Sequence, residues 1–242
     1  MKLAIAALSC AFALLPGLSP AAPSCSANSG AMAPLLVELY TSEGCNSCPP
    51  ADRWLSSIAK SRSDVIALAF HVDYWDSLGW KDRFADAAYT RRQYEIEAGA
   101  GSRFAYTPQV LLNGRDYRSW PFLPAPAGAA LVNLSLAHEG SSYVARLTRL
   151  PAARGGQLLA YWAVTEDSHV SAVKAGENAG ATLKHDAVVR EYRAPQRLDA
   201  ADELTLRFEP RVGSEAGHAR HVVLVITDAR SGQVVQAAQV DC

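Results

Sequence analysis

The chain has 242 residues, a formal net charge of -1, 49% hydrophobic residues and 19% charged residues. Such a composition is typical of a globular protein, and the length allows one large domain or two small ones. Basic and acidic residues are interspersed, without the dense basic tract of a nucleic-acid-binding protein, so we expect no nucleic-acid partner.

Residues 1–22 have the pattern of a secretory signal peptide. Met1-Lys2 provides a basic start, an apolar stretch runs from Leu3 to Leu18, and small residues follow. The apolar stretch is short and is interrupted by Pro16-Gly17, so we expect no stable membrane span once the signal is removed. We therefore expect a periplasmic or secreted protein.

Export determines how the five cysteines are interpreted, because disulfides persist in oxidising compartments. Cys10 leaves with the signal peptide, and the other four form an even set. The close pair Cys45 and Cys48 is the natural first bond, which leaves Cys25 with Cys242 as a structural disulfide near the two ends of the mature chain. The alternative is that Cys25 or Cys242 bonds to another molecule.

The first half, residues 33–139, alternates between strand and helix patterns. The first strand is a continuous apolar run, and Pro49-Pro50 opens the following helix at a position where proline is tolerated. Asn113-Gly114 predicts a tight hairpin. The expected elements are strand 35–40, helix 51–60, strand 65–72, helix 82–98, strand 109–112, hairpin strand 115–118 and helix 127–138.

The second half, residues 140–242, has a different pattern. Short alternating runs are separated by polar turn residues, which favours an antiparallel, sandwich-like β-rich domain. The expected strands are 142–149, 157–165, 183–193, 203–208, 219–227 and 233–240.

Cys45 and Cys48 stand where the first strand gives way to the first helix. Two thiols at this spacing and position indicate a redox pair, because one thiolate attacks a partner disulfide and the other resolves the mixed disulfide. We expect Cys45, nearer the strand, to be the attacking thiol. A disulfide that closes so small a loop restrains the chain little, which makes a purely structural role the weaker interpretation.

The element order and two motifs resemble the thioredoxin superfamily. The motifs are the cysteine pair after the first strand and Thr107-Pro108 directly before the strand 109–112. The resemblance implies an α/β thioredoxin-like domain at 33–139, followed by the β-rich domain at 140–242. It also implies that Pro108 is cis and packs beside the disulfide, with Thr107 and Pro108 belonging to the catalytic site.

The mature chain also resembles a secreted bacterial family of unassigned function, domain of unknown function 1223. The matching segments lie in both halves of the chain. They are Glu38 to Asp52, His71 to Asp76 with Leu78 to Asp82, Tyr106 to Gln109, Gly176-Glu177-Asn178 and Leu183-Lys184-His185.

We therefore expect an exported thiol-disulfide oxidoreductase-like protein that needs no cofactor and acts on a protein thiol or disulfide. One alternative is an accessory protein that binds copper(I) or zinc through Cys45, Cys48 and His71. A further alternative is a non-catalytic binding module with an inert disulfide. The candidate accessory residues are His71, Asp73, Trp75, Asn178 and His185.

Overall fold

The computed structural model describes residues 25–126 and 128–242, so the expected signal peptide lies outside the described residues. Strand accounts for 42% of the residues and helix for 15%. The described ranges contain two α-helices, α1 (Pro49–Ser61) and α2 (Ala87–Gly99), and two short 3₁₀ helices at Asp76–Leu78 and Pro151–Ala153. Neither α-helix in this part of the chain has the length and apolar character needed to cross a bilayer.

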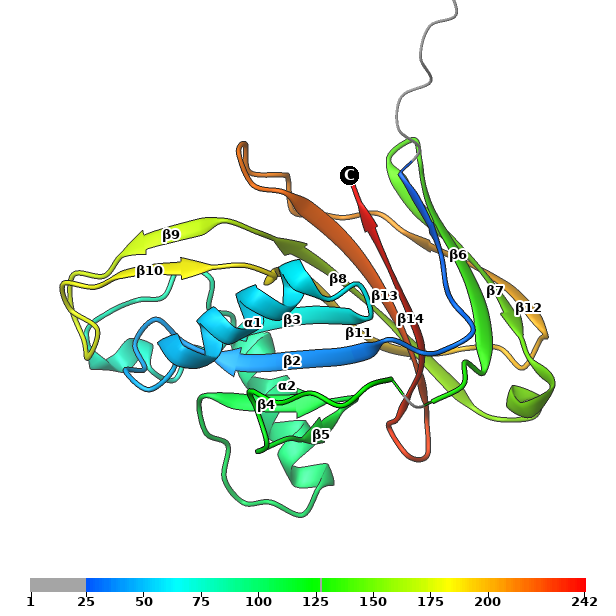
Figure 1. Ribbon diagram of the computed structural model, residues 1–242, viewed down its shortest axis with the longest axis horizontal. Helices are drawn as coiled ribbons and strands as arrows, with labels where there is room; N and C mark the ends of the chain where they lie inside the picture. Colours follow the sequence, from blue (N-terminus) through cyan, green and yellow to red (C-terminus); the bar gives the residue numbers. More distant parts are fainter. Residues whose placement is uncertain (1–24, 127) are drawn as a thin grey trace, which may run out of the picture.

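The largest sheet has eight strands and runs through the centre of the molecule (Figure 1). Its strands β2 and β3 are parallel, and all their residues are buried, as the continuous apolar sequence predicts. In spatial order the strands are β14 (Val234–Asp241), β13 (Arg220–Asp228), β8 (Leu158–Glu166), β11 (Val188–Arg197), β3 (Val65–His71), β2 (Leu35–Thr41), β4 (Gln109–Leu112) and β5 (Arg115–Asp116).

The expectation of an α/β thioredoxin-like domain followed by a separate β-rich domain is wrong. Strands from both halves of the chain form the eight-stranded sheet, because β11 of the second half pairs with β3 of the first at Val188 and Ala69. The Ala69 amide donates to the Ala187 carbonyl at 2.8 Å across the junction. Local patterns predict that a segment is a strand but not which strand it will pair with. Here the backbone hydrogen-bonding groups at the open edge of β3 pair with residues that are distant in the sequence.

Two connections also differ from expectation. The segment after α2 returns as β4, which lies beside β2 and runs antiparallel to it, whereas the order of strand 65–72, helix 82–98 and strand 109–112 by itself favours a parallel crossover. The expected strand 183–193 is split at Asp186-Ala187 into two strands that belong to different sheets. Lys60 of α1 forms an ion pair with Asp186 at 2.7 Å, which fixes the break.

A second sheet of four strands packs against β8, β13 and β14. Its order is β1 (Ser26–Asn28), β6 (Val132–Glu139), β7 (Ser142–Arg149) and β12 (Glu203–Phe208). The expected helix 127–138, of which residues 128–138 are described, is wrong: β6 occupies most of it. Val132, Leu134 and Leu136 alternate into the core, which is the period of a strand. The expected boundary at residue 139 falls at the turn between β6 and β7.

The two helices cover opposite faces of the first-half strands. Leu55 and Ile58 of α1 pack with Val37 and Leu39, whereas Tyr89 of α2 packs with Phe70 on the other face. Helix α2 begins at Ala87, later than the expected residue 82, because Asp86 caps it by accepting from the Ala88 amide at 2.7 Å.

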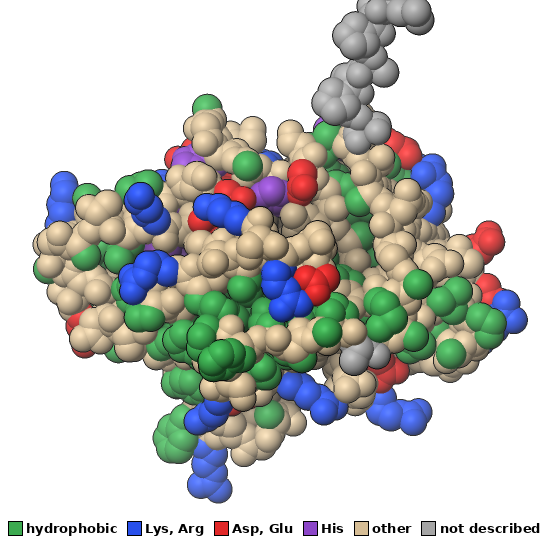
Figure 2. All heavy atoms as spheres, viewed as in Figure 1, with side chains coloured by type: hydrophobic (Ala, Val, Ile, Leu, Met, Phe, Trp, Pro, Cys, Tyr) green, Lys and Arg blue, Asp and Glu red, His purple; other side chains and the backbone are tan. Residues whose placement is uncertain are grey.

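The segment 117–124 lies against α1 through the indole of Trp54, which donates to the Pro121 carbonyl at 3.0 Å. Trp54 also contacts Trp120, with ring centroids 5.8 Å apart. Figure 2 shows hydrophobic side chains gathered on the face of the molecule around α1 and the β4–β5 side. Phe122, which is 78% exposed, belongs to this segment.

A two-stranded ribbon, β9 (His169–Ala172) and β10 (Thr182–His185), projects from the second half toward the first. In Figure 1 the ribbon extends over the end of the sheet where α1 begins. The connecting loop, residues 173–181, is thereby carried to the segment that contains Cys45 and Cys48.

Candidate functional site

Cys45 and Cys48 form a disulfide in the loop between β2 and α1, with their Cα atoms 5.4 Å apart. Both residues are 0% exposed. The loop is tightly turned, since the Cys45 amide donates to the Ser42 carbonyl and the Cys48 amide to the Cys45 carbonyl, each at 3.2 Å. A partner therefore cannot reach either sulfur atom in this conformation.

The start of α1 determines how much the helix can stabilise a thiolate. The helix begins at Pro49, immediately after the disulfide, with Cys48 as its N-cap. Pro49 and Pro50 have no backbone N–H, which removes two of the amides that usually surround the positive end of a helix. The stabilisation of a Cys45 thiolate by this helix terminus is correspondingly reduced.

The loop 173–181 of the second half holds the cysteine segment in place. The side-chain amide of Asn178 donates to the carbonyls of Glu43 and Cys45, at 2.9 and 3.0 Å. The Glu177 carboxylate accepts from the Asn46 amide at 3.1 Å. Asn178, a predicted accessory residue, is thus brought to the cysteine segment. Its neighbour Glu177, which also reaches this segment, was not among the predicted site residues.

Two tryptophans complete the contacts around this segment. Gly44 lies so close to Trp75 that a Cβ atom at this position would be 3.0 Å from the Trp75 Cβ. Trp75 also donates from its indole to Thr107 Oγ1 at 2.8 Å, and the Thr107–Pro108 bond is cis. Gly176, with φ of +73°, packs against Trp80. Trp75 therefore connects the cysteine segment to the predicted Thr107-Pro108 motif.

Asp73 is the predicted accessory residue that the structure does not bring into the site. Its carboxylate accepts from Thr90 Oγ1 at 2.6 Å, and its amide donates to the same hydroxyl oxygen at 3.1 Å. Both bonds tie the end of β3 to α2. This residue fixes the helix position and makes no contact with the cysteine segment.

Buried ionisable side chains surround the base of the cysteine loop. His71 Nδ1 lies 2.7 Å from Asp82 Oδ2, and the same oxygen accepts from the Glu43 amide at 2.9 Å. Glu43 in turn accepts from the Trp80 indole at 2.7 Å and lies 3.3 Å from His185 Nε2. Glu43 and Asp82 were not among the predicted site residues, although both lie in the segments that carry the family resemblance.

Charge compensation sets the pKa values in this cluster. Burial alone would lower the pKa of His71, but attraction to Asp82, with smaller contributions from Asp52 and Glu43, raises it above the ordinary value of 6.5. Burial would raise the pKa of Asp82, but the interaction with His71 outweighs it and lowers that pKa. The pKa of Asp52 in α1 is raised by burial.

In the described part of the chain, every buried side-chain polar atom that lacks a protein partner belongs to this neighbourhood. These atoms include His71 Nε2 and His185 Nδ1, and the two imidazole rings lie 5.0 Å apart. His185 Nε2 faces the Glu43 carboxylate at 3.3 Å as an ion pair and makes no hydrogen bond of ordinary geometry. Because an unpartnered buried polar atom is costly, such a concentration distinguishes this neighbourhood from the rest of the described core.

The donors of the metal-binding alternative do not converge. In the described ranges, two groups of three or more Cys, His, Asp or Glu residues have their donor atoms all within 4.8 Å, and neither contains Cys45, Cys48 or His71. His71 Nδ1 is also committed to Asp82. The arrangement thus gives no support to a copper or zinc site at the Cys45–Cys48 pair.

The second disulfide joins Cys25 to Cys242, with Cα atoms 5.5 Å apart. It links residues separated by 217 positions. Cys242 is exposed and Cys25 is half-buried. The two disulfides therefore differ both in the length of chain that they close and in their accessibility.

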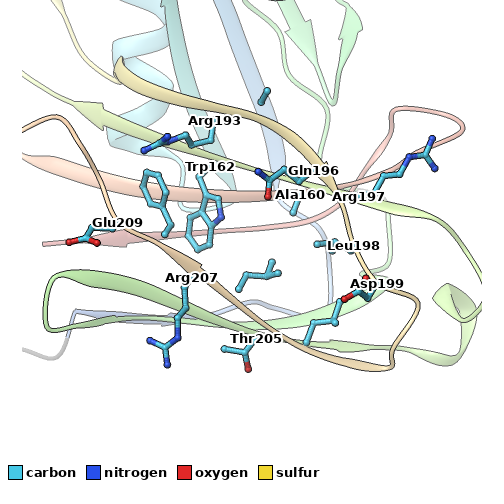
Figure 3. A pocket seen from close by; sticks show the side chains of 14 residues that line it. Ala160, Trp162, Arg193, Gln196, Arg197, Leu198, Asp199, Thr205, Arg207 and Glu209 are labelled. Carbon is cyan, nitrogen blue, oxygen red and sulfur yellow. The ribbon is translucent and has the colours of Figure 1, made fainter.

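A cavity of about 440 Å³ lies in a different part of the fold, between β8, β11 and β12 (Figure 3). Trp162 and Phe208 stack in its wall with ring centroids 5.1 Å apart. None of its lining residues belongs to the cysteine site.

Comparison with known protein families places this chain in a family. The buried Cys45–Cys48 site lies within residues 36–226, the range that matches the model of a protein family of unknown function. The chain belongs to this family, DUF1223. No curated protein sequence matches the chain.

Two solved structures resemble it. Protein AGR_C_4864 from Agrobacterium tumefaciens is 26% identical with a TM-score of 0.64, and the match covers 86% of this chain and 94% of that one. HBP35 of Porphyromonas gingivalis is 14% identical with a TM-score of 0.64, covering 87% of this chain and 75% of that one. The second likeness concerns the fold alone.

Proposed function

We propose that the protein is a thiol-disulfide oxidoreductase whose exchangeable bond is Cys45–Cys48, acting on a protein thiol or disulfide in the periplasm or outside the cell. The observation that carries this proposal is the position of a short-loop disulfide at the end of the central parallel strand β2, inside a cluster of buried ionisable groups. A bond that closes so few residues contributes little to chain restraint, which favours a chemical role.

The chemistry follows from the two thiols of the reduced pair. Cys45, as a thiolate, attacks a disulfide of the partner, and the mixed disulfide is then resolved by Cys48. The reduced pair would be kept as neutral thiols while buried, because burial disfavours the charged form. Reaction therefore requires that the cysteine segment become accessible first.

The loop 173–181 is the element that must move. Its three hydrogen bonds to the cysteine segment come from Asn178 and Glu177. Breaking these contacts separates the loop 173–181 from the segment 43–46, whose Glu43 end stays bonded to Asp82 and Trp80. Access to the disulfide is thereby coupled to a part of the chain outside the first half.

Trapping tests the proposal and the assignment of the two thiols. Cys48→Ser is expected to accumulate a mixed disulfide through Cys45 in extract from the exported fraction, because the resolving thiol is missing. Cys45→Ser is expected to trap nothing. Trapping by Cys45→Ser alone would reverse the roles of the two thiols, and equal, negligible trapping by two folded variants would reject exchange.

The second candidate function is a binding module with an inert disulfide. Complete burial of both cysteines favours it. The two candidates differ in one property, because an inert bond resists reduction in the folded protein whereas an exchangeable one equilibrates with a dithiol. The reduction potential of Cys45–Cys48 in the folded chain separates them.

A further inference from the structure

A second group of sulfur and nitrogen donors lies at the edge of the molecule, apart from the cysteine loop. The Sγ atoms of Cys25 and Cys242 and a ring nitrogen of His138 all lie within 4.8 Å of one another. In Figure 1 the chain end after β14 and the start of the described chain lie near the same end of β6. His138 and Cys242 are exposed.

The backbone holds these three residues together independently of the disulfide. The His138 amide donates to the Cys25 carbonyl at 2.9 Å, and β1 pairs with β6 from Ser26 onward. The Cys242 amide donates to the Arg220 carbonyl at 3.3 Å at the end of the β13–β14 ladder. Reduction therefore leaves both thiols in place next to His138.

The ring of His138 is held in place by an aromatic contact, and its nitrogens are not used in side-chain hydrogen bonds within the described residues. It stacks on Tyr143, with centroids 4.6 Å apart and an interplanar angle of 23°. Within the described residues its nitrogens make no side-chain hydrogen bond, whereas His221 nearby is bound to Asp167 and Asp241. The imidazole thus retains a nitrogen lone pair for a ligand.

Two thiolates and one imidazole suit zinc. Zinc is bound at about 2.3 Å from sulfur, which places two thiolates roughly 3.7 Å apart in a tetrahedral site. Side-chain rotation from a disulfide, with Cα atoms 5.5 Å apart, is enough to reach that separation. The fourth position faces solvent because Cys242 is exposed, so the site would keep an open position.

We propose that reduction of Cys25–Cys242 creates a zinc site formed by Cys25, Cys242 and His138. A dithiol reductant transfers two electrons and two protons to the disulfide, giving two thiols and the cyclic disulfide of the reductant. Zinc then displaces both thiol protons into solvent and takes the two thiolates and the imidazole as ligands. In the reverse step a disulfide oxidant accepts two electrons from the two zinc-bound thiolates and becomes two thiolates itself, the Cys25–Cys242 bond re-forms and the zinc ion is released.

The other donor group in the described ranges is a poorer candidate. His169, Glu215 and His218 also have donor atoms within 4.8 Å of one another. Arg83 and Arg190 both contact His169 at 3.2 Å and both form ion pairs with Glu215. Two guanidinium groups oppose binding of a cation there.

The test titrates full-length mature protein with zinc, and with cobalt as a spectroscopic probe, before and after reduction by a dithiol that is then removed without air. The Cys45→Ser/Cys48→Ser chain leaves the Cys25–Cys242 pair as the source of thiols in the mature protein. We expect one metal ion per reduced chain, a thiolate-to-cobalt absorption band, and no binding by the oxidised chain.

His138→Phe is the matched variant, because phenylalanine keeps the ring stack on Tyr143 and removes the nitrogen donor. We expect it to weaken zinc binding by at least ~10-fold. If the Cys45→Ser/Cys48→Ser chain does not fold, reduced wild-type protein is compared with Cys25→Ser/Cys242→Ser, which should bind one metal ion fewer. Absence of binding after reduction, or equal binding by His138→Phe, would overturn the proposal.

Discussion

The two disulfides of this protein differ in their accessibility to solvent and in the length of chain that they close. Cys25–Cys242 is at the surface and closes almost the whole described chain, whereas Cys45–Cys48 is fully buried and closes a loop of two intervening residues. The first stabilises the folded protein because it closes a long loop and so restricts the unfolded chain. The second lies in a segment that hydrogen-bonds to the loop 173–181 of the second half. The comparison teaches that the accessibility of a disulfide and the length of chain that it closes are independent properties.

Removing each disulfide separately gives the largest expected effect. The chain-entropy relation gives about 5.4 kcal/mol for a separation of 217 residues and about 1.6 kcal/mol for a separation of 3. Cys25→Ala/Cys242→Ala should therefore lower the free energy of unfolding by about 4 kcal/mol more than Cys45→Ala/Cys48→Ala. Urea unfolding of both variants and wild type measures the difference. Equal losses of unfolding free energy in the two variants would show that the two disulfides stabilise the protein to the same extent.

The buried surroundings of Cys45–Cys48 can be tested through Asp82. Asp82→Asn leaves the His71 imidazole without its charged partner, so we expect a loss of about 3 kcal/mol in the free energy of unfolding. Asp199→Asn, at an exposed position, is the control and should change stability by less than about 0.5 kcal/mol. A similar small change in the unfolding free energy of both variants would show that the His71–Asp82 pair does not contribute to stability.

The same pair predicts a pH dependence of stability. Because the pKa of His71 is raised, its contribution is complete below its ordinary pKa of 6.5 and is lost as the pH rises through the raised value. Because the pKa of Asp82 is lowered, its contribution is complete above its ordinary pKa of 3.8 and is lost as the pH falls through the lowered value. The difference between wild type and Asp82→Asn should thus be largest between pH 3.8 and 6.5, as urea unfolding across that range will measure.

Opening of the covering loop should alter one disulfide and leave the other unchanged. Asn178→Ala removes two hydrogen bonds to the cysteine segment, worth about 1 kcal/mol each. We expect reduction of Cys45–Cys48 by a dithiol to become roughly 30-fold faster, because about 1.4 kcal/mol corresponds to ten-fold. Mass spectrometry of alkylated protein follows each bond.

Lys174→Ala is the control in the same loop, since Lys174 is exposed and makes no contact with the cysteine segment. It should leave both reduction rates unchanged. A faster reduction of Cys25–Cys242 in Asn178→Ala would indicate general destabilisation and would remove the special role of the loop 173–181.

The sequence predicted local features of the site better than its surroundings. The short spacing of Cys45 and Cys48 and the continuous apolar run before them are local signals, and the structure contains both the disulfide and the buried strand. The pairing of β11 with β3, by contrast, depends on the meeting of two strand edges 119 positions apart at Ala69 and Val188. No periodicity in either segment encodes that choice of partner.

Asn178 and Glu43 show the same limit at the level of side chains. Asn178 belongs to a Gly-Glu-Asn turn that reads locally as a loop, and only the β9–β10 ribbon brings it to the Cys45 carbonyl. Glu43 was overlooked because a charged residue beside a glycine is typical of solvent-exposed turns, yet it is completely buried. The signal that pointed to a buried site was a charged residue close behind a largely apolar, fully buried strand.

The reduction potential of each disulfide in the folded protein tests the central claim most directly. Equilibration with dithiol buffers, followed by mass mapping of both bonds, gives the two values separately. We predict that Cys45–Cys48 equilibrates between about -120 and -270 mV, the range of exchange-active pairs, and that Cys25–Cys242 lies roughly 60 mV or more below it. A Cys45–Cys48 potential below about -300 mV, as in structural disulfides, would contradict the account.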